Sequence, residues 1–143
     1  MSIANSILEV IKLRGSDRSR SEPFVKAMYS TYPKNPWNAR EFAIPTSVKD
    51  GQVQDFLMVE LDVDRTRDNT AHIKFVYSSE HKQGHGSAAM RELMDRAKKA
   101  NVSLSLSAWE HGKVSASKLK RWYKRLGFKE DKTVQTVLIY DPS

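Results

Sequence analysis

The sequence predicts a single α/β (α+β) domain, in which a mixed central β-sheet with a parallel strand–helix–strand core is flanked by helices. Two observations support one domain: the chain has 143 residues, and 39% of them are hydrophobic while 29% are charged. A third observation gives the class. The hydrophobic period changes along the chain from helical to alternating and back to helical.

Two helices are expected before residue 36. The first has Ser2 as a suitable N-cap and is broken at residues 15–17. The second begins at Ser21, places Pro23 in its first turn, where a missing N–H is tolerated, and ends within residues 32–36. The apolar face of the first helix is Ile3, Ile7, Val10 and Ile11.

Strands are expected next. A short strand is predicted at residues 40–45, followed by a turn from Pro45 to Gly51. Alternation of apolar and polar residues predicts longer strands at 57–64 and 71–77, which a short polar turn makes antiparallel. In the second of these strands, one face is expected to hold Ile73, Phe75 and Tyr77, and the other His72, Lys74 and Val76.

The C-terminal half alternates helices and strands. Helical spacing predicts a helix at 87–100, alternation predicts a strand at 102–108, and a second helix starts at Ser115 or Ser117. Gly127 suits the left-handed residue that follows a helix, and a closing strand is expected at 134–140. A strand–helix–strand unit implies a parallel strand pair, so the sheet is mixed.

A glycine-containing loop, Gln83-Gly84-His85-Gly86-Ser87-Ala88, joins a predicted strand to a predicted helix. Unpaired N–H groups and the positive dipole end of a helix's first turn favour a bound phosphate, and small residues leave it accessible. The loop has neither the Walker pattern nor the three-glycine dinucleotide pattern. Taken alone, it is explained equally well as a tight strand-to-helix turn.

Two motifs resemble those of GNAT acetyltransferases. Gln83, Gly86 and Ala88 match the acetyl-CoA loop pattern Arg/Gln-x-x-Gly-x-Gly/Ala. The segment 122–128, Trp-Tyr-Lys-Arg-Leu-Gly-Phe, is similar to the family's late Phe-Tyr-x-x-x-Gly-Phe signature. The resemblance spans roughly residues 56–140. It implies one GNAT-like domain over residues 1–143, with an acceptor-side part at 1–55 and an acetyl-CoA-binding core at 56–143.

The resemblance also implies a function and its residues. The chain would transfer an acetyl group from acetyl-CoA to a primary amine by direct attack, with no covalent enzyme intermediate. Backbone amides of residues 83–88 would bind the pyrophosphate, and backbone groups near Phe75, Val76 and Tyr77 would pair with the pantetheine arm. Tyr123 would protonate the departing thiolate, because a phenol with a pKa near 10 keeps its proton at neutral pH.

The sequence departs from the family pattern at two places. The family's cofactor-contacting asparagine, seven residues before the tyrosine, is replaced by Ala116, so Ser115 or Ser117 is the candidate contact. The start of the fourth strand holds no glutamate to serve as general base. The candidates are Glu60, His72 and Glu110, although Glu60 shares a strand face with Asp62 and Asp64, which is typical of a solvated face.

Composition leaves other functions open. The absence of cysteine excludes disulfides and thiolate chemistry, and His81 and His85 flank a loop rather than share a helix face, so no metal site is predicted. The net charge of +7 favours a polyanionic ligand. The basic residues on or near the last helix are Lys113, Lys118, Lys120, Arg121, Lys124 and Arg125.

These cations suggest an alternative, a nucleic-acid-binding or aminoacyl-tRNA-directed protein, although the solvated side of an amphipathic helix is the simpler interpretation. A CoA-binding regulatory GNAT fold without turnover is a second alternative. The acceptor, a small-molecule or protein amine, stays open, as does the choice between monomer and homodimer. With no visible signal peptide and no apolar run of membrane-spanning length, the expected location is the cytoplasm, with no membrane partner.

Overall fold

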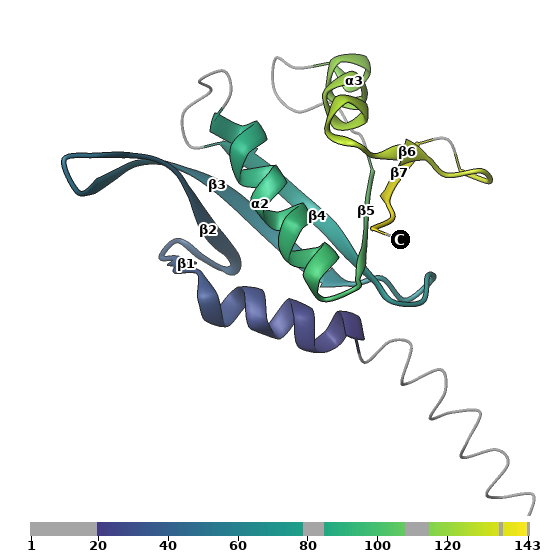
Figure 1. The fold of residues 1–143 in the computed structure, drawn as a ribbon, viewed down its shortest axis with the longest axis horizontal. Coiled ribbons are helices and arrows are strands. Elements are labelled where there is room, and N and C mark those ends of the chain that lie inside the picture. Colours follow the sequence, from purple (N-terminus) through teal and green to yellow (C-terminus); the bar gives the residue numbers. More distant parts are fainter. Residues whose placement is uncertain (1–19, 79–84, 108–114, 135, 143) are drawn as a thin grey trace, which may run out of the picture.

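The computed structural model describes residues 20–78, 85–107, 115–134 and 136–142, with the side chains at 47, 48, 53, 54, 78 and 85 excepted. These residues form a seven-stranded sheet in the order β1-β2-β3-β4-β5-β7-β6 (Figure 1). The strands are β1 (Lys34–Asn35), β2 (Asn38–Lys49), β3 (Gln52–Val63), β4 (Thr70–Ser78), β5 (Ser103–Ser107), β6 (Lys129–Glu130) and β7 (Val137–Tyr140).

The sheet is mixed, as the sequence predicts. β4 and β5 are parallel and are connected by the helix α2 (His85–Lys99), whereas β2–β3, β3–β4 and β5–β7 are antiparallel. A parallel pair requires a crossover, and here the crossover contains α2. The expected single α/β domain with a strand–helix–strand core is therefore confirmed.

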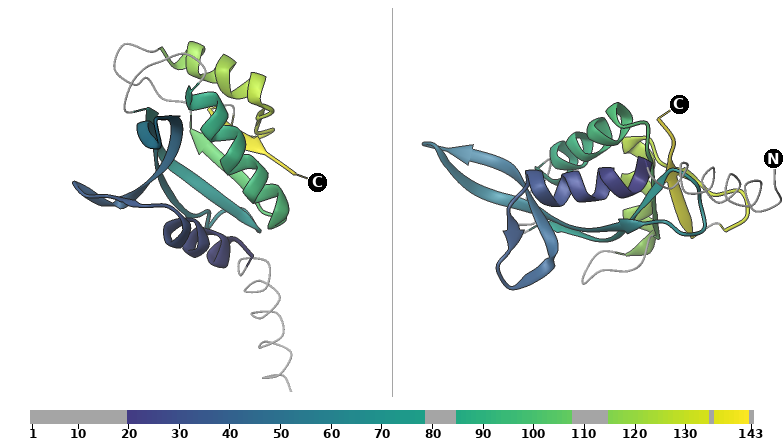
Figure 2. Two further views of the ribbon diagram at one scale, coloured as in Figure 1. Left: turned by 60° about the vertical axis from the view of Figure 1, so that its left-hand side comes forward. Right: turned by 90° about the horizontal axis from the view of Figure 1, so that it is seen from below.

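Two helices cover the same face of the sheet (Figure 2). One is α2, and the other occupies residues 20–31. The latter helix ends before Pro33, as expected, because a residue that precedes proline is disfavoured in helical conformation. The predicted first helix, near residues 2–14, lies outside the described residues.

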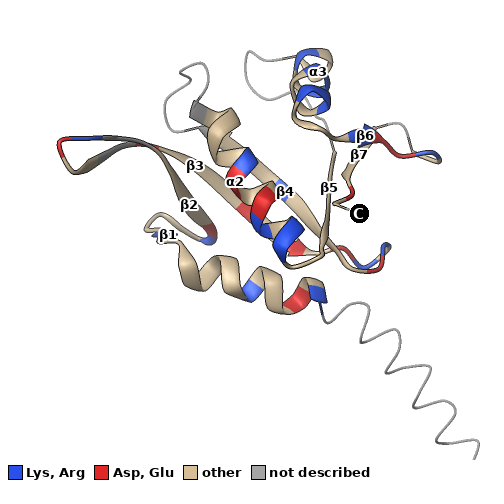
Figure 3. Cartoon of the chain, viewed as in Figure 1, with Lys and Arg blue, Asp and Glu red and all other residues tan. Residues whose placement is uncertain are grey.

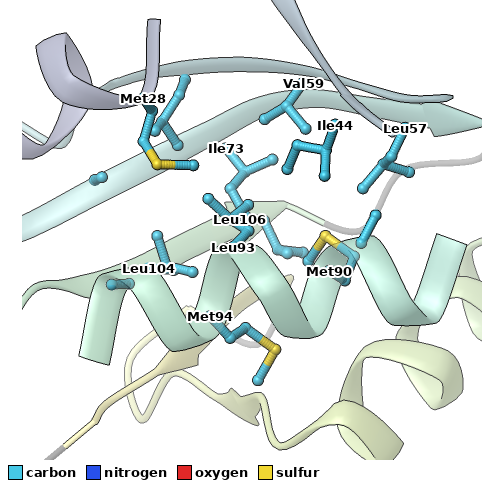
Figure 4. Close-up of a cluster of buried hydrophobic side chains, with 14 of the residues drawn as sticks. Met28, Ile44, Leu57, Val59, Ile73, Met90, Leu93, Met94, Leu104 and Leu106 are labelled. Carbon is cyan, nitrogen blue, oxygen red and sulfur yellow. The ribbon is translucent and has the colours of Figure 1, made fainter. Parts of the chain in front are cut away.

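The core lies between these helices and the sheet (Figure 4). The apolar stripe of α2, including Met90 and Leu93, meets side chains that project from alternate positions of four strands. Close packing of this kind makes the core sensitive to the loss of a single methyl group. The sheet contributes Ile44, Leu57, Val59, Leu61, Ala71, Ile73, Leu104 and Leu106.

The hairpin β2–β3 is longer than predicted. Its turn consists of Asp50 and Gly51, both with left-handed φ of 53° and 77°, and the residues before them belong to β2. Pro45, which we expected to begin a turn, lies inside β2 next to a register irregularity between Pro45 and Ser47. Proline is tolerated in a strand at such irregularities, so this expectation was wrong.

The last helix, α3 (Ala116–Leu126), has the ends that the sequence predicts. Ser115 is its N-cap and accepts a hydrogen bond from the backbone N–H of Lys118, while Gly127 follows with φ of 119°. The strand β6, which pairs with β7, was not predicted because two residues are too short to show alternation.

Leu93 tests the core. Its side chain is fully buried, so we expect Leu93→Ala to lower the free energy of unfolding by about 2–5 kcal/mol through lost contacts and a residual cavity. Urea denaturation would measure this. The control is Arg91→Ala, at an exposed position of the same helix, expected to change stability by less than about 0.5 kcal/mol. Equal effects of the two substitutions would contradict this description of the core.

Candidate functional site

The first turn of α2 is built from small residues and carries no acidic side chain. Gly86, Ser87 and Ala88 follow His85, where the helix begins, and Ala88 is exposed. The first N–H groups of a helix have no intrahelical acceptor, and the dipole makes this end positive. The turn therefore favours an anion. The other predicted loop residues, Gln83 and Gly84, lie outside the described residues.

Trp122 of α3 packs against this turn. Its indole Nε1 donates a hydrogen bond of 2.7 Å to Ser87 Oγ. A Cβ atom on Gly86 would lie 3.7 Å from Trp122 Cζ2, so the backbone and the indole are close to contact. Trp122 thus fastens α3 to the start of α2. The prediction that Trp122 faces inward is confirmed.

A bulge in β4 interrupts the alternation of its side chains between the two faces of the sheet. Leu61 of β3 pairs with Ile73, but Glu60 pairs with Phe75, so Lys74 is an extra residue. Ile73 and Val76 both pack against the core, whereas Phe75 is 47% exposed.

The expectation that Ile73, Phe75 and Tyr77 share a face was therefore wrong, since strict alternation assumes no inserted residue. Phe75 and Tyr77 instead lie on the face opposite the core, with ring centroids 6.3 Å apart. The Tyr77 hydroxyl donates to Glu41 Oε1 at 2.8 Å. Glu41 is buried and was missed at the sequence level, because nothing nearby in the sequence marks it as a partner of Tyr77.

β4 and β5 separate just after the bulge begins. Their parallel pairing runs from Thr70↔Ser103 to Ile73↔Leu106, while β4 continues to Ser78. The carboxyl end of β4 leads toward the first turn of α2, so the widening and the helix N–H groups share one edge of the sheet. In open α/β sheets, ligands bind at the carboxyl ends of the strands. The predicted pantetheine contacts, residues 75–77, lie in this widened part of β4.

Tyr123 lies in the core. It is 5% exposed and packs beside Trp122 and Phe128, with centroid distances of 4.8 Å and 5.8 Å. Burial raises the pKa of the Tyr123 hydroxyl well above its ordinary value of 10, so the group keeps its proton at neutral pH. The expected inward face of α3 is confirmed: Leu119, Trp122, Tyr123 and Leu126 all belong to or contact the core.

Two of the three base candidates lie on the face of the sheet opposite the core. Glu60 is 4.0 Å from Lys74 Nζ, and Asp62 is 3.7 Å from the same atom. His72 pairs with Asp62 across β3 and β4. Glu110 lies outside the described residues.

His72 belongs to a short hydrogen-bonded chain. Its Nδ1 lies 2.8 Å from Ser105 Oγ, and Ser105 Oγ lies 2.7 Å from Asp64 Oδ2. Ser105 and Asp64 are buried, with exposures of 0% and 6%. The prediction that Asp64 lies on a solvated face with Glu60 was therefore wrong. One signal in the sequence could have indicated that Asp64 is a hydrogen-bond acceptor within the fold. Thr66, two residues later, donates to Asp64 from both its backbone N–H and its hydroxyl.

In the described structure the Ser115 side chain caps the N-terminus of α3. Its predicted cofactor contact stays a prediction.

Lys and Arg residues lie along α3 (Figure 3), and two of them form ion pairs with one carboxylate. Lys120 Nζ and Lys124 Nζ lie 2.8 Å and 2.6 Å from Glu130 Oε1. Hydrogen bonds from these two lysines lower the pKa of Glu130 to about 2. Lys118, Arg121 and Arg125 are exposed, and Lys113 lies outside the described residues. Since Trp122 is also held by Ser87, no aromatic side chain of α3 is presented for base stacking.

Among residues 20–78, 85–107, 115–134 and 136–142, no three His, Cys, Asp or Glu side chains are grouped to hold a metal ion. In the same part of the chain, no helix has the length and apolar character needed to cross a bilayer.

The chain is similar in structure to several solved proteins. The anti-CRISPR protein AcrVA5 matches at 18% identity with a TM-score of 0.50, over 61% of this chain and 90% of AcrVA5. The Tetrahymena GCN5 structure matches at 15% identity and a TM-score of 0.46, over 89% of this chain and 91% of GCN5. AtaTR bound with AcCoA matches at 16% identity and a TM-score of 0.48, over 74% of this chain and 70% of the AtaTR chain.

No protein-family model and no curated protein sequence matches this chain. At these identities the structural similarity concerns the fold. Together with the mixed sheet and the parting of β4 and β5, it shows that the chain has a GNAT-like fold, as the two motifs predict.

The contact between Trp122 and Ser87 can be measured by a double-mutant cycle. Trp122→Phe keeps an aromatic ring but removes the donor, and we expect it to lower the free energy of unfolding by about 1–2 kcal/mol, from the lost bond and lost ring area. Adding Ser87→Ala should then have little further effect, giving a coupling of about 1 kcal/mol in urea denaturation. Strictly additive effects would show that the bond contributes nothing.

Proposed function

We propose that the chain is an acetyl-CoA-dependent N-acetyltransferase in which a primary amine attacks the bound thioester directly. One observation carries the proposal. In a GNAT-like fold, the parallel strands β4 and β5 part at the edge of the sheet where the small-residue first turn of α2 begins. A thioester can enter that opening while its diphosphate lies on helix N–H groups.

The cofactor would be held mainly by backbone. The amides of residues 83–88, of which Gly86, Ser87 and Ala88 are in the described first turn, would bind the pyrophosphate. Backbone groups of Phe75, Val76 and Tyr77 would align the pantetheine arm along the widened part of β4. The lack of acidic side chains in the first turn of α2 suits this role, since a carboxylate there would repel the diphosphate.

Tyr123 would act as the general acid. As the N–C bond forms and the C–S bond breaks, negative charge develops on sulfur, and a protonated phenol nearby can neutralise it. Its burial beside Trp122 and Phe128 keeps the hydroxyl protonated and fixes the ring. The remaining contribution would be positioning of the amine against the thioester carbonyl.

The nucleic-acid alternative is supported less well. Lys120 and Lys124 form ion pairs with Glu130, and Trp122 packs inward with its indole N–H bonded to Ser87. Two of the cations and the aromatic residue considered for base stacking therefore already have partners. The basic surface of α3 is accounted for as the outer side of an amphipathic helix.

Acetyl-CoA binding is tested first with the substitution Ala88→Asp. A carboxylate in the first turn of α2 suits the helix dipole, so we expect an unchanged or slightly higher Tm. The same charge faces the diphosphate, so the Kd for acetyl-CoA in calorimetry should rise at least about tenfold, an electrostatic effect of roughly 1.4 kcal/mol. The matched control, Ala88→Asn, has nearly the same shape without the charge and should bind like the unaltered protein. No binding by the unaltered protein at low salt would disprove the function.

Tyr123→Phe tests the acid. The phenyl ring keeps the aromatic packing, while the proton donor is lost, so kcat should fall by about 10²-fold or more with little change in Kd for acetyl-CoA. Release of free thiol would be followed with a panel of amines: a lysine peptide, a peptide N-terminus, spermidine and an aminoacyl-tRNA. Unchanged turnover in the variant would remove Tyr123 from the mechanism.

A further inference from the structure

Three polar side chains from separate segments meet on the face of the sheet opposite the core. His72 lies on β4, Ser105 on β5, and Asp64 directly after β3. Their contacts of 2.8 Å and 2.7 Å form a continuous chain from the imidazole to the carboxylate. Two of the three groups are buried, so this chain is not an exchangeable surface contact.

The hydrogen-bond donors and acceptors of this chain fix the imidazole tautomer. An ionised carboxylate only accepts hydrogen bonds, so the single Ser105 hydroxyl proton is donated to Asp64. The Ser105 oxygen must then accept, and the proton between it and His72 belongs to Nδ1. In the neutral ring Nε2 therefore carries the lone pair, which is the arrangement of a base directed away from Ser105.

Asp64 is held in its ionised form. Burial alone would raise its pKa, but hydrogen bonds from Ser105 and Thr66, with the charge of Arg67, outweigh burial and lower the pKa. The Thr66 N–H and hydroxyl lie 2.9 Å and 2.6 Å from Asp64 Oδ1, and Arg67 Nη1 lies 3.2 Å from Oδ2. The carboxylate that orients Ser105 is thus itself fixed in position.

Burial favours the neutral form of the His72 imidazole, and the charges that face it act in both directions. Burial is the largest effect and lowers its pKa. Asp64 and Asp62 raise the pKa, while Arg67 and Lys74 lower it, and the net result is a pKa below the ordinary 6.5. These groups come from β3, from β4 and from the turn between them.

His72 also lies near the end of the parallel pairing between β4 and β5, next to the proposed thioester site. It pairs with Ser105 one residue before the last β4–β5 pair, Ile73↔Leu106, beyond which the strands separate. Glu60, the other described base candidate, lies close to the ammonium group of Lys74. Of the two, His72 is the side chain next to the opening and the one whose proton position is fixed.

We propose that His72 is the general base of the acetyl transfer, and that Ser105 and Asp64 are positioning residues that hold its ring proton on Nδ1. This inference rests on the proposed acetyltransferase function. In the step, the acceptor ammonium loses one proton to His72 Nε2, which passes it to water. The free amine then attacks the thioester carbonyl and the C–S bond breaks as Tyr123 protonates the departing thiolate. The proton that the new amide nitrogen loses returns through water to the Tyr123 phenolate, which restores the acid.

Activity against pH tests the proposal, with acetyl-CoA and the most rapidly acetylated amine of the panel. In the unaltered protein, kcat/KM should rise with pH through a pKa below 6.5. His72→Asn places an amide N–H close to the position of Nδ1, which preserves donation to Ser105 but removes the base. We expect it to lower kcat/KM by about 10²-fold or more at pH 7 and to abolish this rise.

Ser105→Ala should lower kcat/KM by about tenfold, and Ser105→Thr, which restores a hydroxyl, should recover part of the loss. The matched control is Ser103→Ala, two residues earlier on the same face of β5, which should leave the profile unchanged. Melting curves of all variants separate folding defects from loss of the base.

A second readout needs no substrate. The ¹⁵N shifts of the His72 ring in the unaltered protein at pH 7 should show a neutral imidazole protonated on Nδ1, and Ser105→Ala should shift the proton toward Nε2. A charged ring, or one protonated on Nε2 in the unaltered protein, overturns the proposal even if the protein is an active acetyltransferase. So does turnover that His72→Asn leaves intact. Absence of acetyl-CoA turnover by the unaltered protein instead overturns the acetyltransferase function, and the role of His72 with it.

Discussion

The inserted residue Lys74 in β4 is the constraint on which the rest of the site depends. Before it, β4 pairs in register with both β3 and β5; after it, β4 stays with β3 and leaves β5. The same insertion turns Phe75 and Tyr77 to the face opposite the core and Val76 into the core. A bulge increases local twist, which is how one extra residue parts two strands without breaking the sheet.

The packing around the opening keeps it at one edge. Below Ile73 and Leu106, the parallel strands are covered by α2, whose Met90 and Leu93 fill the space above them. Toward the carboxyl ends of the strands α2 begins with small residues, of which Gly86 lies close to Leu57 and Trp122. The parallel pairing of β4 and β5 therefore ends at Ile73 and Leu106, and His72 lies one residue before that end.

The architecture was predictable because it depends on local patterns. Alternation in β3 and β5, the helical stripe of α2 and the caps Ser115 and Gly127 each act over a few residues, and each was confirmed. The bulge at Lys74 was not predictable, because it depends on how β3 and β4 pair. It reversed the expected faces of Phe75 and Tyr77.

The candidate site likewise has parts that local sequence patterns predict and parts that depend on how the strands pair. The helix-start motif and the inward face around Tyr123 follow from spacing along the chain, whereas the chain of hydrogen bonds among Asp64, Ser105 and His72 joins residues up to 41 positions apart. Single-sequence reasoning interprets an aspartate after an alternating strand as solvated. Only the fold shows that β5 brings a buried serine beside it.

The hydrogen bond from Trp122 to Ser87 has a consequence for how the two helices respond to each other. The indole is attached to the same turn that suits an anion, so occupation of that turn and the docking of α3 share one equilibrium. By thermodynamic linkage, an anion on this turn that changed the free energy of α3 docking would have its own binding free energy changed by the same amount.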